Sequence, residues 1–284
     1  MSILEFLQRN MNPSLNISNI MNDYSYDKYL ERQSFEITPD CILEKLASIK
    51  KANNFEWIEN DWKPNSYEGF GVITMVRDHP KNELLITKLE EIQKEFDLKL
   101  ATKDRNLFSK YFQLPATSYH QTLANLLSNE RFQKNIIDRD LLKNFPNIIK
   151  EAFERCDEEE YFQPIAMKMI GLSVFGTCVA MLGTFVHEGD YQRITDIRNS
   201  IYKQDNLADL DIKMTRPFIG HITLTYFEAE FIDSEKANLG TVINEINQKL
   251  SEEENIFYIN STSLRRFHHL AEFLTVENYP KILI

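Results

Sequence analysis

The chain is poor in cysteine, and its cysteines have no spacing typical of a metal or redox site. Cys41, Cys156 and Cys178 are far apart, and none belongs to a Cys-x-x-Cys pair. An odd number of isolated cysteines argues against a disulfide framework and against a structural zinc site. We therefore expect neither feature to organise the fold.

The sequence also lacks an excess of positive charge. It has 32 Lys and Arg against 43 Asp and Glu, which gives a formal net charge of −11. Proteins that bind long nucleic acids through many phosphate contacts need clustered basic residues. The composition argues against extended nucleic acid as a partner, but it is compatible with a small or short phosphorylated ligand held at a local site.

Long apolar runs are missing as well. No stretch approaches the ~20 apolar residues that a membrane-spanning helix needs. Residues 1–10 include Glu5 among their apolar side chains and lack the basic lead and apolar core of a signal peptide. These absences predict a cytoplasmic protein without a membrane partner.

What the chain does contain is 43% apolar residues over 284 positions, enough for one large domain or two small ones. Residues 1–65 are interpreted as a mainly helical or irregular appendage, and residues 66–284 as the main domain. The stretch 10–22, rich in Asn, Ser and Pro, favours turns. Trp57 and Trp62 are expected to pin the appendage onto the main domain, with base stacking as the alternative.

The order strand, helix, His-x-Thr strand, helix occurs in both halves of residues 66–284. Strands are predicted at 67–76, 165–175, 177–186, 215–227 and 256–267, and helices at 39–50, 82–96, 138–155, 191–202 and 234–250. Pro146 is expected to kink or divide its helix. The repeated order predicts an α+β fold that is bilobal, with two antiparallel-rich sheets, helices on the outer faces and a central cleft.

Two His-x-Thr sequences are the candidates for chemistry. His120 and Thr122 lie in Ser118-Tyr-His-Gln-Thr-Leu123, and His221 and Thr223 lie 101 residues further on. Side chains two apart on a strand point to the same face, so each motif presents an imidazole beside a hydroxyl. In a regular second strand the other face would carry Phe218, Gly220, Ile222, Leu224 and Tyr226.

Two such pairs supply the groups that metal-independent phosphodiester cleavage needs. One imidazole can take a proton from the attacking hydroxyl or water while the other protonates the departing oxygen, because imidazole titrates near pH ~6.5. Two hydroxyls can hold the non-bridging phosphate oxygens. The alternative interpretation is that both histidines are partly buried structural residues with local hydrogen bonds.

The motifs resemble those of the 2H phosphoesterases, a family that includes the LigT-like RNA cyclic phosphodiesterases and is defined by two His-x-(Thr/Ser) motifs. Arg216-Pro-Phe-Ile-Gly-His-Ile-Thr-Leu224 is similar to the second family motif, and Tyr119-His-Gln-Thr-Leu123 to the first. Gln121 stands where the family often has an apolar residue. The resemblance covers about residues 67–267.

This resemblance implies a phosphodiesterase that uses no metal or other cofactor. Its substrate would be a small nucleotide or RNA-end phosphodiester, such as a 2′,3′-cyclic phosphate or a 2′-5′ linkage. His120 and His221 would be the acid–base pair, and Thr122 and Thr223 would bind the phosphate. Which histidine is the acid stays open.

Further residues have weaker roles in this interpretation. Arg216 is a candidate substrate contact or a surface residue at a strand entrance. Tyr119 and Tyr226 are expected to pack on the faces opposite the histidines. The basic run from Arg265 to His269 is expected at a solvated strand end, with the cleft edge as the alternative.

Two other functions compete with the phosphodiesterase. One is a catalytically silent module that binds nucleotides or RNA ends in the same cleft. The other is a metal-dependent hydrolase that uses His187, Glu188 and Asp190, although their position in a predicted turn favours an ordinary polar loop.

Overall fold

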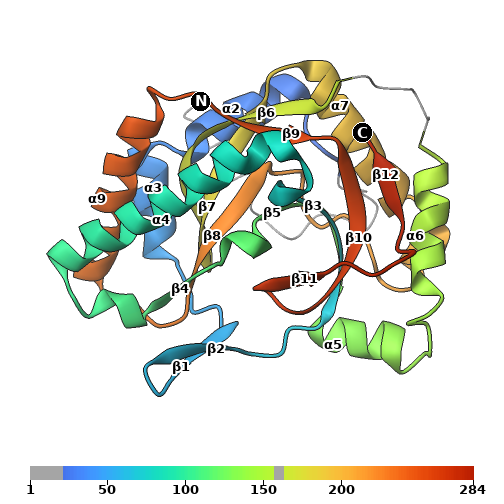
Figure 1. Ribbon diagram of the computed structural model, residues 1–284, viewed down its shortest axis with the longest axis horizontal. Coiled ribbons are helices and arrows are strands. Elements are labelled where there is room, and N and C mark those ends of the chain that lie inside the picture. Colours follow the sequence, from blue (N-terminus) through green and yellow to red (C-terminus); the bar gives the residue numbers. More distant parts are fainter. Residues whose placement is uncertain (1–21, 157–162) are drawn as a thin grey trace, which may run out of the picture.

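The computed structural model describes residues 22–156 and 163–284 (Figure 1). It is a mixed α/β structure with two five-stranded sheets and a two-stranded hairpin. The strand pairs are antiparallel throughout this part of the chain. The predicted α+β class with antiparallel sheets is therefore confirmed. Except for Asn22, the turn-rich stretch 10–22 lies outside the described residues.

The first sheet has the strand order β11-β10-β3-β5, with β12 also paired to β10. Its strands are β3 (Gly69–Met75), β5 (His120–Ser128), β10 (Ser261–His269), β11 (Glu272–Leu274) and β12 (Lys281–Leu283). One face packs against helices through Phe70, whose ring lies 5.6 Å from that of Phe132 and 4.9 Å from that of Phe145. Small residues at Gly69 and Gly71 and β-branched residues after them suit this tightly paired central strand.

The second sheet has the order β4-β8-β7-β6-β9. Its strands are β4 (Tyr111–Gln113), β6 (Ile165–Phe175), β7 (Cys178–Phe185), β8 (His221–Phe227) and β9 (Asn255–Ile259). β6 and β7 form a hairpin whose turn contains Gly176 at φ +49°, a conformation that glycine adopts without a side-chain clash. This confirms the two strands predicted around that glycine.

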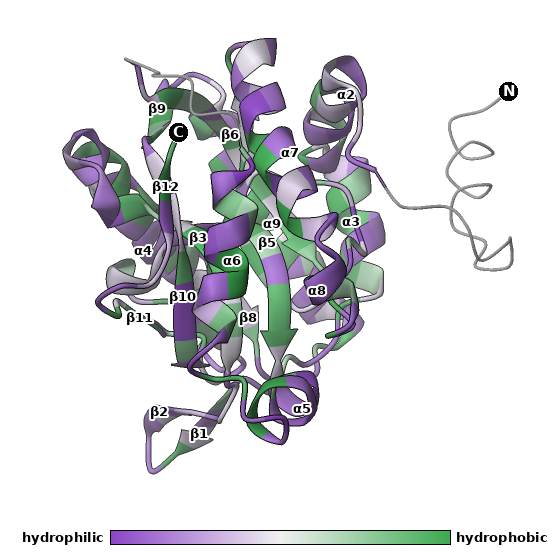
Figure 2. Ribbon diagram, turned by 90° about the vertical axis from the view of Figure 1, so that its right-hand side faces the viewer, coloured by the Kyte–Doolittle hydropathy of each residue, from purple (hydrophilic) through white to green (hydrophobic). Residues whose placement is uncertain are grey.

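Helices cover the outer faces of the sheets. They are α2 (Tyr26–Glu36), α3 (Pro39–Ala47), α4 (Glu83–Lys103), α5 (Asn129–Phe132), α6 (Phe145–Glu154), α7 (Glu188–Tyr202), α8 (Asp205–Ala208) and α9 (Asp233–Leu250). Short 3₁₀ turns lie at Val76–Asp78, Pro80–Asn82, Leu107–Ser109 and Ala116–Ser118, and a π-helical turn at Gln133–Ile137. In Figure 2, α6, α7 and α8 lie in front of strand β5.

Several predicted elements have different boundaries. The strand predicted over 215–227 begins only at His221, and the helix predicted over 82–96 extends to Lys103. The helix predicted over 138–155 begins only at Phe145, so Pro146 lies in its first turn, where a missing N–H costs no hydrogen bond; the expected kink is wrong. The strand predicted over 256–267 is two strands, because the chain leaves the second sheet after β9 and enters the first at β10. A single local pattern does not reveal such a change of sheet.

The N-terminal helices pack directly on the second sheet. The Tyr29 hydroxyl and the Gln33 side-chain amide each donate to the Gly183 carbonyl at 2.8 Å. Tyr29, Ile42 and Leu46 belong to the same hydrophobic core as the strands. Residues 26–47 are thus part of the packed structure around β6 and β7, while the domain boundary at residue 65 stays a prediction.

A hairpin follows, formed by β1 (Phe55–Ile58) and β2 (Asp61–Pro64). Glu59 and Asn60 have φ of +53° and +63°, as in a type I′ turn. Trp57 lies opposite Trp62, with ring centroids 5.2 Å apart, and Trp62 contacts Phe112 of β4 at 5.9 Å. The tryptophans therefore pack against this edge of the second sheet, as the sequence predicts.

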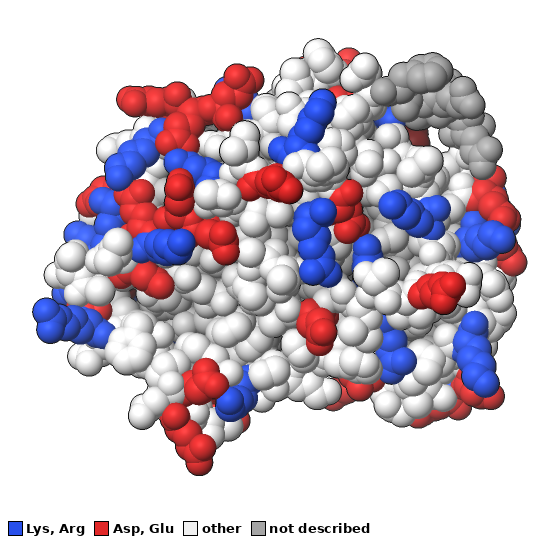
Figure 3. Space-filling model, viewed as in Figure 1, with Lys and Arg blue, Asp and Glu red and all other residues white. Residues whose placement is uncertain are grey.

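The two large sheets meet where β5 and β8 lie side by side near the middle of the molecule (Figures 1 and 2). Acidic and basic side chains are intermixed over the face shown in Figure 3. No helix within residues 22–156 and 163–284 is long and apolar enough to cross a membrane.

Candidate active site

The two predicted histidines begin the two strands that meet between the sheets. His120 is the first residue of β5, and His221 is the first residue of β8. Both are partly buried. β5 contacts β8, so the structure brings the two strands that carry the motifs together.

Both rings are held by the same kind of hydrogen bond. His120 Nδ1 lies 2.7 Å from the Ser118 carbonyl, and His221 Nδ1 lies 2.8 Å from the Ile219 carbonyl. In each case the acceptor is the backbone oxygen two residues earlier. A carbonyl can only accept, so Nδ1 carries the proton and Nε2 keeps its lone pair. Each imidazole is therefore oriented by the same Nδ1 hydrogen bond, which leaves its Nε2 able to accept a proton.

A β-bulge follows each His-x-Thr sequence at the same position. In β5, Thr122 pairs with Ile73 and Ala124 with Val72, so Leu123 is the extra residue. In β8, Thr223 pairs with Ala180 and Thr225 with Val179, so Leu224 is the extra residue. A bulge of this kind changes which side chains share a face of the sheet.

The bulge overturns the expected orientation of Tyr226. Tyr226 pairs with Cys178, Thr223 with Ala180 and His221 with Leu182. Since Cys178, Ala180 and Leu182 alternate regularly on β7, their three partners share one face. Tyr226 therefore lies on the histidine face, and the expectation that it packs on the opposite face is wrong.

The residue that corresponds to Tyr226 in the first motif is Asn125, also five positions after its histidine. It pairs with Gly71, which alternates with Ile73 and Met75, so Asn125 shares a face with Thr122 and His120. Its side chain is exposed. The two halves thus present a histidine, a threonine and one further polar side chain each.

Tyr119 behaves as predicted. Its ring is fully buried, and its hydroxyl donates to Gln93 Oε1 at 2.5 Å. Gln121, the departure from the family motif, pairs with Thr74 and is buried on the face opposite His120. Its Oε1 has no hydrogen-bond partner among the described residues. Compared with an apolar residue at this position, the Gln121 amide affects the packing on the opposite face of β5 and does not reach the face that carries His120.

An aromatic ring lies against each imidazole. Phe273 of β11 contacts His120, with centroids 4.1 Å apart, and Phe175 of β6 contacts His221 at 5.3 Å. The register of β6, β7 and β8 places Phe175, Cys178 and Tyr226 on one line across the sheet. These rings exclude water from one side of each imidazole.

Burial lowers the pKa of both histidines. The pKa of His120 falls from its ordinary 6.5 to about 4, mainly through desolvation, against the opposing hydrogen bond to the Ser118 carbonyl. The pKa of His221 also falls to about 4 through burial, and the positive charges of Arg216, His120 and Arg32 lower it further. In the free protein both imidazoles are therefore neutral at pH 7.

The candidate phosphate-binding hydroxyls lie beside these rings. Thr122 is partly buried, and Thr223 is buried with 8% of its surface exposed. Arg216, the candidate substrate contact, is exposed; besides burial, its charge lowers the pKa of His221. Within the described part of the chain, its guanidinium has neither an ion-pair partner nor a hydrogen-bond partner.

Arg198 of α7 connects the two motifs, a role that no local pattern in the sequence indicates. Its Nη1 donates to the carbonyl of the bulged Leu123, and its Nη2 donates to the Arg216 carbonyl at 3.2 Å. Its Nε donates to Asp23 at 3.1 Å. The Asp23 carboxylate also accepts from the Phe218 N–H at 2.5 Å. A buried ion pair thus joins the first bulge to the segment before β8.

Other groups considered from the sequence lie elsewhere. Arg265 is buried and bonded to Asp78 at 3.0 Å, so the expected solvated strand end is wrong for this residue. His187 and Glu188 are exposed at the start of α7. Among the residues that the structure describes, no three His, Cys, Asp or Glu side chains are grouped as metal ligands.

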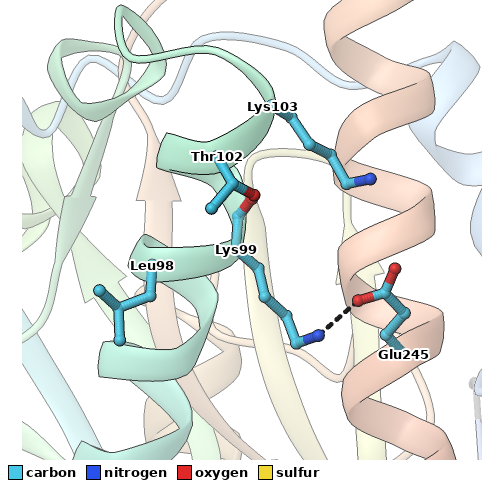
Figure 4. A pocket seen from close by; sticks show the side chains of 5 residues that line it. All are labelled: Leu98, Lys99, Thr102, Lys103 and Glu245. Carbon is cyan, nitrogen blue, oxygen red and sulfur yellow. Dashed lines mark hydrogen bonds and ion pairs between the residues drawn. The ribbon is translucent and has the colours of Figure 1, made fainter.

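A surface pocket of about 340 Å³ lies between α4 and α9 (Figure 4). It is lined by Leu98, Lys99, Thr102, Lys103 and Glu245. Lys99 and Glu245 form an ion pair at 2.5 Å across it, which neutralises both charges. The pocket contains neither histidine, and we do not place the site there.

No family model matches the chain, and no curated protein matches it. Similar solved structures include a conserved protein of unknown function from Agrobacterium tumefaciens, 16% identical with a TM-score of 0.49, covering 75% of this chain and 86% of that one. A protein of Thermus thermophilus is 12% identical with a TM-score of 0.41, covering 76% of this chain and 94% of that one. At this level of similarity, neither bears on the activity.

Proposed function

We propose that this protein is a metal-independent phosphodiesterase of the 2H type, acting on a small nucleotide or RNA-end phosphodiester such as a 2′,3′-cyclic phosphate or a 2′-5′ linkage. The supporting observation is that two His-x-Thr units are built alike, with the same Nδ1 anchor and the same bulge, on neighbouring strands. The proposal includes a bilobal fold with a central cleft, a cytoplasmic location and no cofactor.

In this mechanism the phosphate lies between the two Nε2 atoms. One neutral imidazole accepts a proton from the attacking water as the water oxygen bonds to phosphorus. The other imidazole, protonated in the complex, gives its proton to the departing ribose oxygen as the P–O bond breaks. Thr122 and Thr223 donate to the non-bridging oxygens, where negative charge increases in the transition state. The motifs allow either histidine to fill either role.

The test is hydrolysis of 2′,3′-cyclic nucleotides and 2′-5′-linked dinucleotides in the presence of a chelator. His120→Ala and His221→Ala should each lower kcat/KM by about 10² to 10⁴, the usual contribution of a general acid or base. His187→Ala is the matched control, because this exposed histidine lies outside both motifs. Full activity of both motif variants, shown to be folded, would refute the proposal.

A second candidate is a binding module that keeps the site without turnover. It is favoured by the pKa of about 4 for both histidines, which leaves no protonated acid in the free protein at pH 7. This candidate predicts that cyclic nucleotides raise the melting temperature while no product forms in prolonged incubation. Product formation that depends on both histidines would exclude it.

A further inference from the structure

Positive charge gathers on the His221 side of the site, in a chain whose formal net charge is −11. Part of this charge comes from the N-terminal helices. The end of α2 lies over β6, because Ser173 Oγ donates to the Glu36 carbonyl at 2.7 Å. Ser173 pairs with Ala180, which pairs with Thr223, so this contact is on the histidine face of the sheet. The corner between α2 and α3 therefore borders the His221 half.

Lys45 of α3 reaches the aromatic ring that covers His221. Its Nζ lies 4.5 Å from the centroid of Phe175, whose ring is 5.3 Å from that of His221. It also hydrogen-bonds to Ser173 Oγ at 3.4 Å. The side chain is partly exposed, so its charge is available to a ligand on this face.

Arg32 and Arg216 complete the group. Arg32 and Lys45 share one carboxylate, that of Glu36; the Arg32 Nε contact is 3.3 Å. Arg216 lies five residues before His221, in the segment that enters β8, and its side chain is exposed. Burial raises the pKa of the Cys178 thiol, and the charges of Arg216 and Lys45 both lower it. Three cations against the one carboxylate leave an excess of two positive charges within this group.

The His120 half has a different environment. Its covering ring, Phe273, belongs with Ile73, Met75 and Phe267 to a small hydrophobic cluster. Arg265, on the same sheet face, is neutralised by Asp78. The two halves share their histidines and threonines, but Arg265 in the first half is paired with Asp78, whereas the second half holds three cations against one carboxylate. The two motifs are alike, but the charges around them differ. This difference indicates a ligand that carries more negative charge at the His221 end than at the His120 end.

We propose that Arg32, Lys45 and Arg216 form a second anion site beside His221, which binds a phosphate group of the substrate other than the one that is cleaved. The substrate class is therefore a nucleotide phosphodiester with an additional terminal phosphate. Guanidinium and ammonium groups are the usual donors to phosphate, and the exposed Arg216 can bind in a bidentate manner. This inference rests on the proposed function for the position of the scissile phosphate.

The experiment compares matched ligands with and without the extra phosphate. The substrates are a 2′-5′-linked diadenosine and the same molecule with a 5′-phosphate, and the measured quantity is the ratio of their kcat/KM values. We expect the phosphorylated substrate to be preferred at least about tenfold, the effect of one charge-assisted contact. The ratio should fall toward one in Arg216→Gln and in Lys45→Met.

Lys81→Met is the matched control. Lys81 Nζ lies 5.2 Å from the ring centroid of Tyr258, and the Tyr258 ring stacks on His79 at 5.7 Å. This arrangement of lysine, aromatic ring and histidine resembles that of Lys45, Phe175 and His221. Tyr258 pairs with Ala166, at the end of β6 opposite Phe175. This variant should keep the wild-type ratio. Arg216→Gln tests the idea even if Lys45→Met fails to fold, because the Arg216 side chain is exposed.

Binding separates this inference from the proposed function. Calorimetry with adenosine 2′,5′-bisphosphate and adenosine 2′-phosphate should show at least about tenfold tighter binding of the bisphosphate, lost in Arg216→Gln. If this holds without turnover, the anion site stands and the phosphodiesterase proposal fails. If turnover depends on both histidines but neither the substrate ratio nor the bisphosphate preference exceeds one, the anion site is refuted.

Discussion

Each motif imidazole is held by a hydrogen bond to the backbone just before its own strand. The carbonyl two residues before the histidine accepts from Nδ1 in both motifs, at 2.7 Å for His120 and 2.8 Å for His221. Phe273 and Phe175 cover one side of the rings. The same surroundings that orient Nε2 also remove water, which is why the pKa of each ring is low.

The pH dependence should reflect these low pKa values. In the free protein both are about 4. Below pH 4 the base is protonated, and above it the acid loses its proton, so kcat/KM should be highest near pH 4 and fall about tenfold per pH unit toward neutrality. A bound phosphate stabilises imidazolium, so kcat should persist to higher pH. A kcat/KM optimum at pH 7 would contradict this.

The same shifts predict acid sensitivity of the fold. Each histidine binds its proton near pH 6.5 when unfolded and near 4 when folded. Between these values the unfolded state holds more protons, so the free energy of unfolding should decrease as pH falls from 6.5 to 4. Replacing one histidine by Gln should make this decrease shallower in urea titrations.

The two threonine hydroxyls can be tested at constant shape. Thr122→Val and Thr223→Val should each lower kcat by about 10² to 10³, the cost of removing one donor to the transition-state oxygen. Thr225→Val serves as the control, since the bulge turns Thr225 away from the histidine face. Equal activity of Thr223→Val and the control, with equal stability, would remove the hydroxyl from the mechanism.

At the scale of elements, the bulges and α7 lie where the two motif strands meet. Each bulge lies one residue after a motif threonine. Arg198 of α7 binds the carbonyl of the first bulged residue, Leu123, and the Arg216 carbonyl before β8. The helix thereby joins an edge strand of the first sheet to the entrance of the second motif.

Loss of this connection should destabilise the protein. In Arg198→Met the Asp23 carboxylate, whose side chain is 4% exposed, stays buried without its cation. Breaking one partner of a buried pair typically costs about 3 to 5 kcal/mol. Urea unfolding should show this loss, and adding Asp23→Asn should recover part of it because no charge remains buried. A loss below about 1 kcal/mol for Arg198→Met would show that the pair is not needed.

For the whole molecule, the chain crosses between sheets so that both halves meet at β5 and β8. The crossing at Asn260 sends β9 and β10 to different sheets. The N-terminal helix α2 is attached to β7 of the second sheet through the hydrogen bonds of Tyr29 and Gln33 to the Gly183 carbonyl. The proposed site therefore exists only in the assembled molecule.

In the proposed mechanism the two histidines act as one unit. The double variant His120→Ala/His221→Ala should have a kcat close to that of the worse single variant, since removing one catalytic partner already disables the other. The measurement is single-turnover hydrolysis of a 2′,3′-cyclic nucleotide. Losses that multiply in the double variant would show that the histidines act independently.

The sequence by itself determined the elements and the candidate residues. Apolar periodicity located β3, α4, β6, β7, α7 and α9, because it reflects which face of each element is buried. The repeated His-x-Thr spacing selected both histidines, because alternation along a strand is a local property. Because alternation is a local property, it did not predict the β-bulges at Leu123 and Leu224 that follow the two threonines.

Only the tertiary structure decided the rest. The bulge that turns Tyr226 to the histidine face depends on pairing with β7, and the change of sheet at Asn260 depends on two partners distant in sequence. Arg198 and Lys45, which lie 23 and 176 residues before His221 in the sequence, become neighbours of the site through the helices that carry them. Spacing along one chain carries no information about such contacts, because burial and strand pairing set them only when the sheets come together.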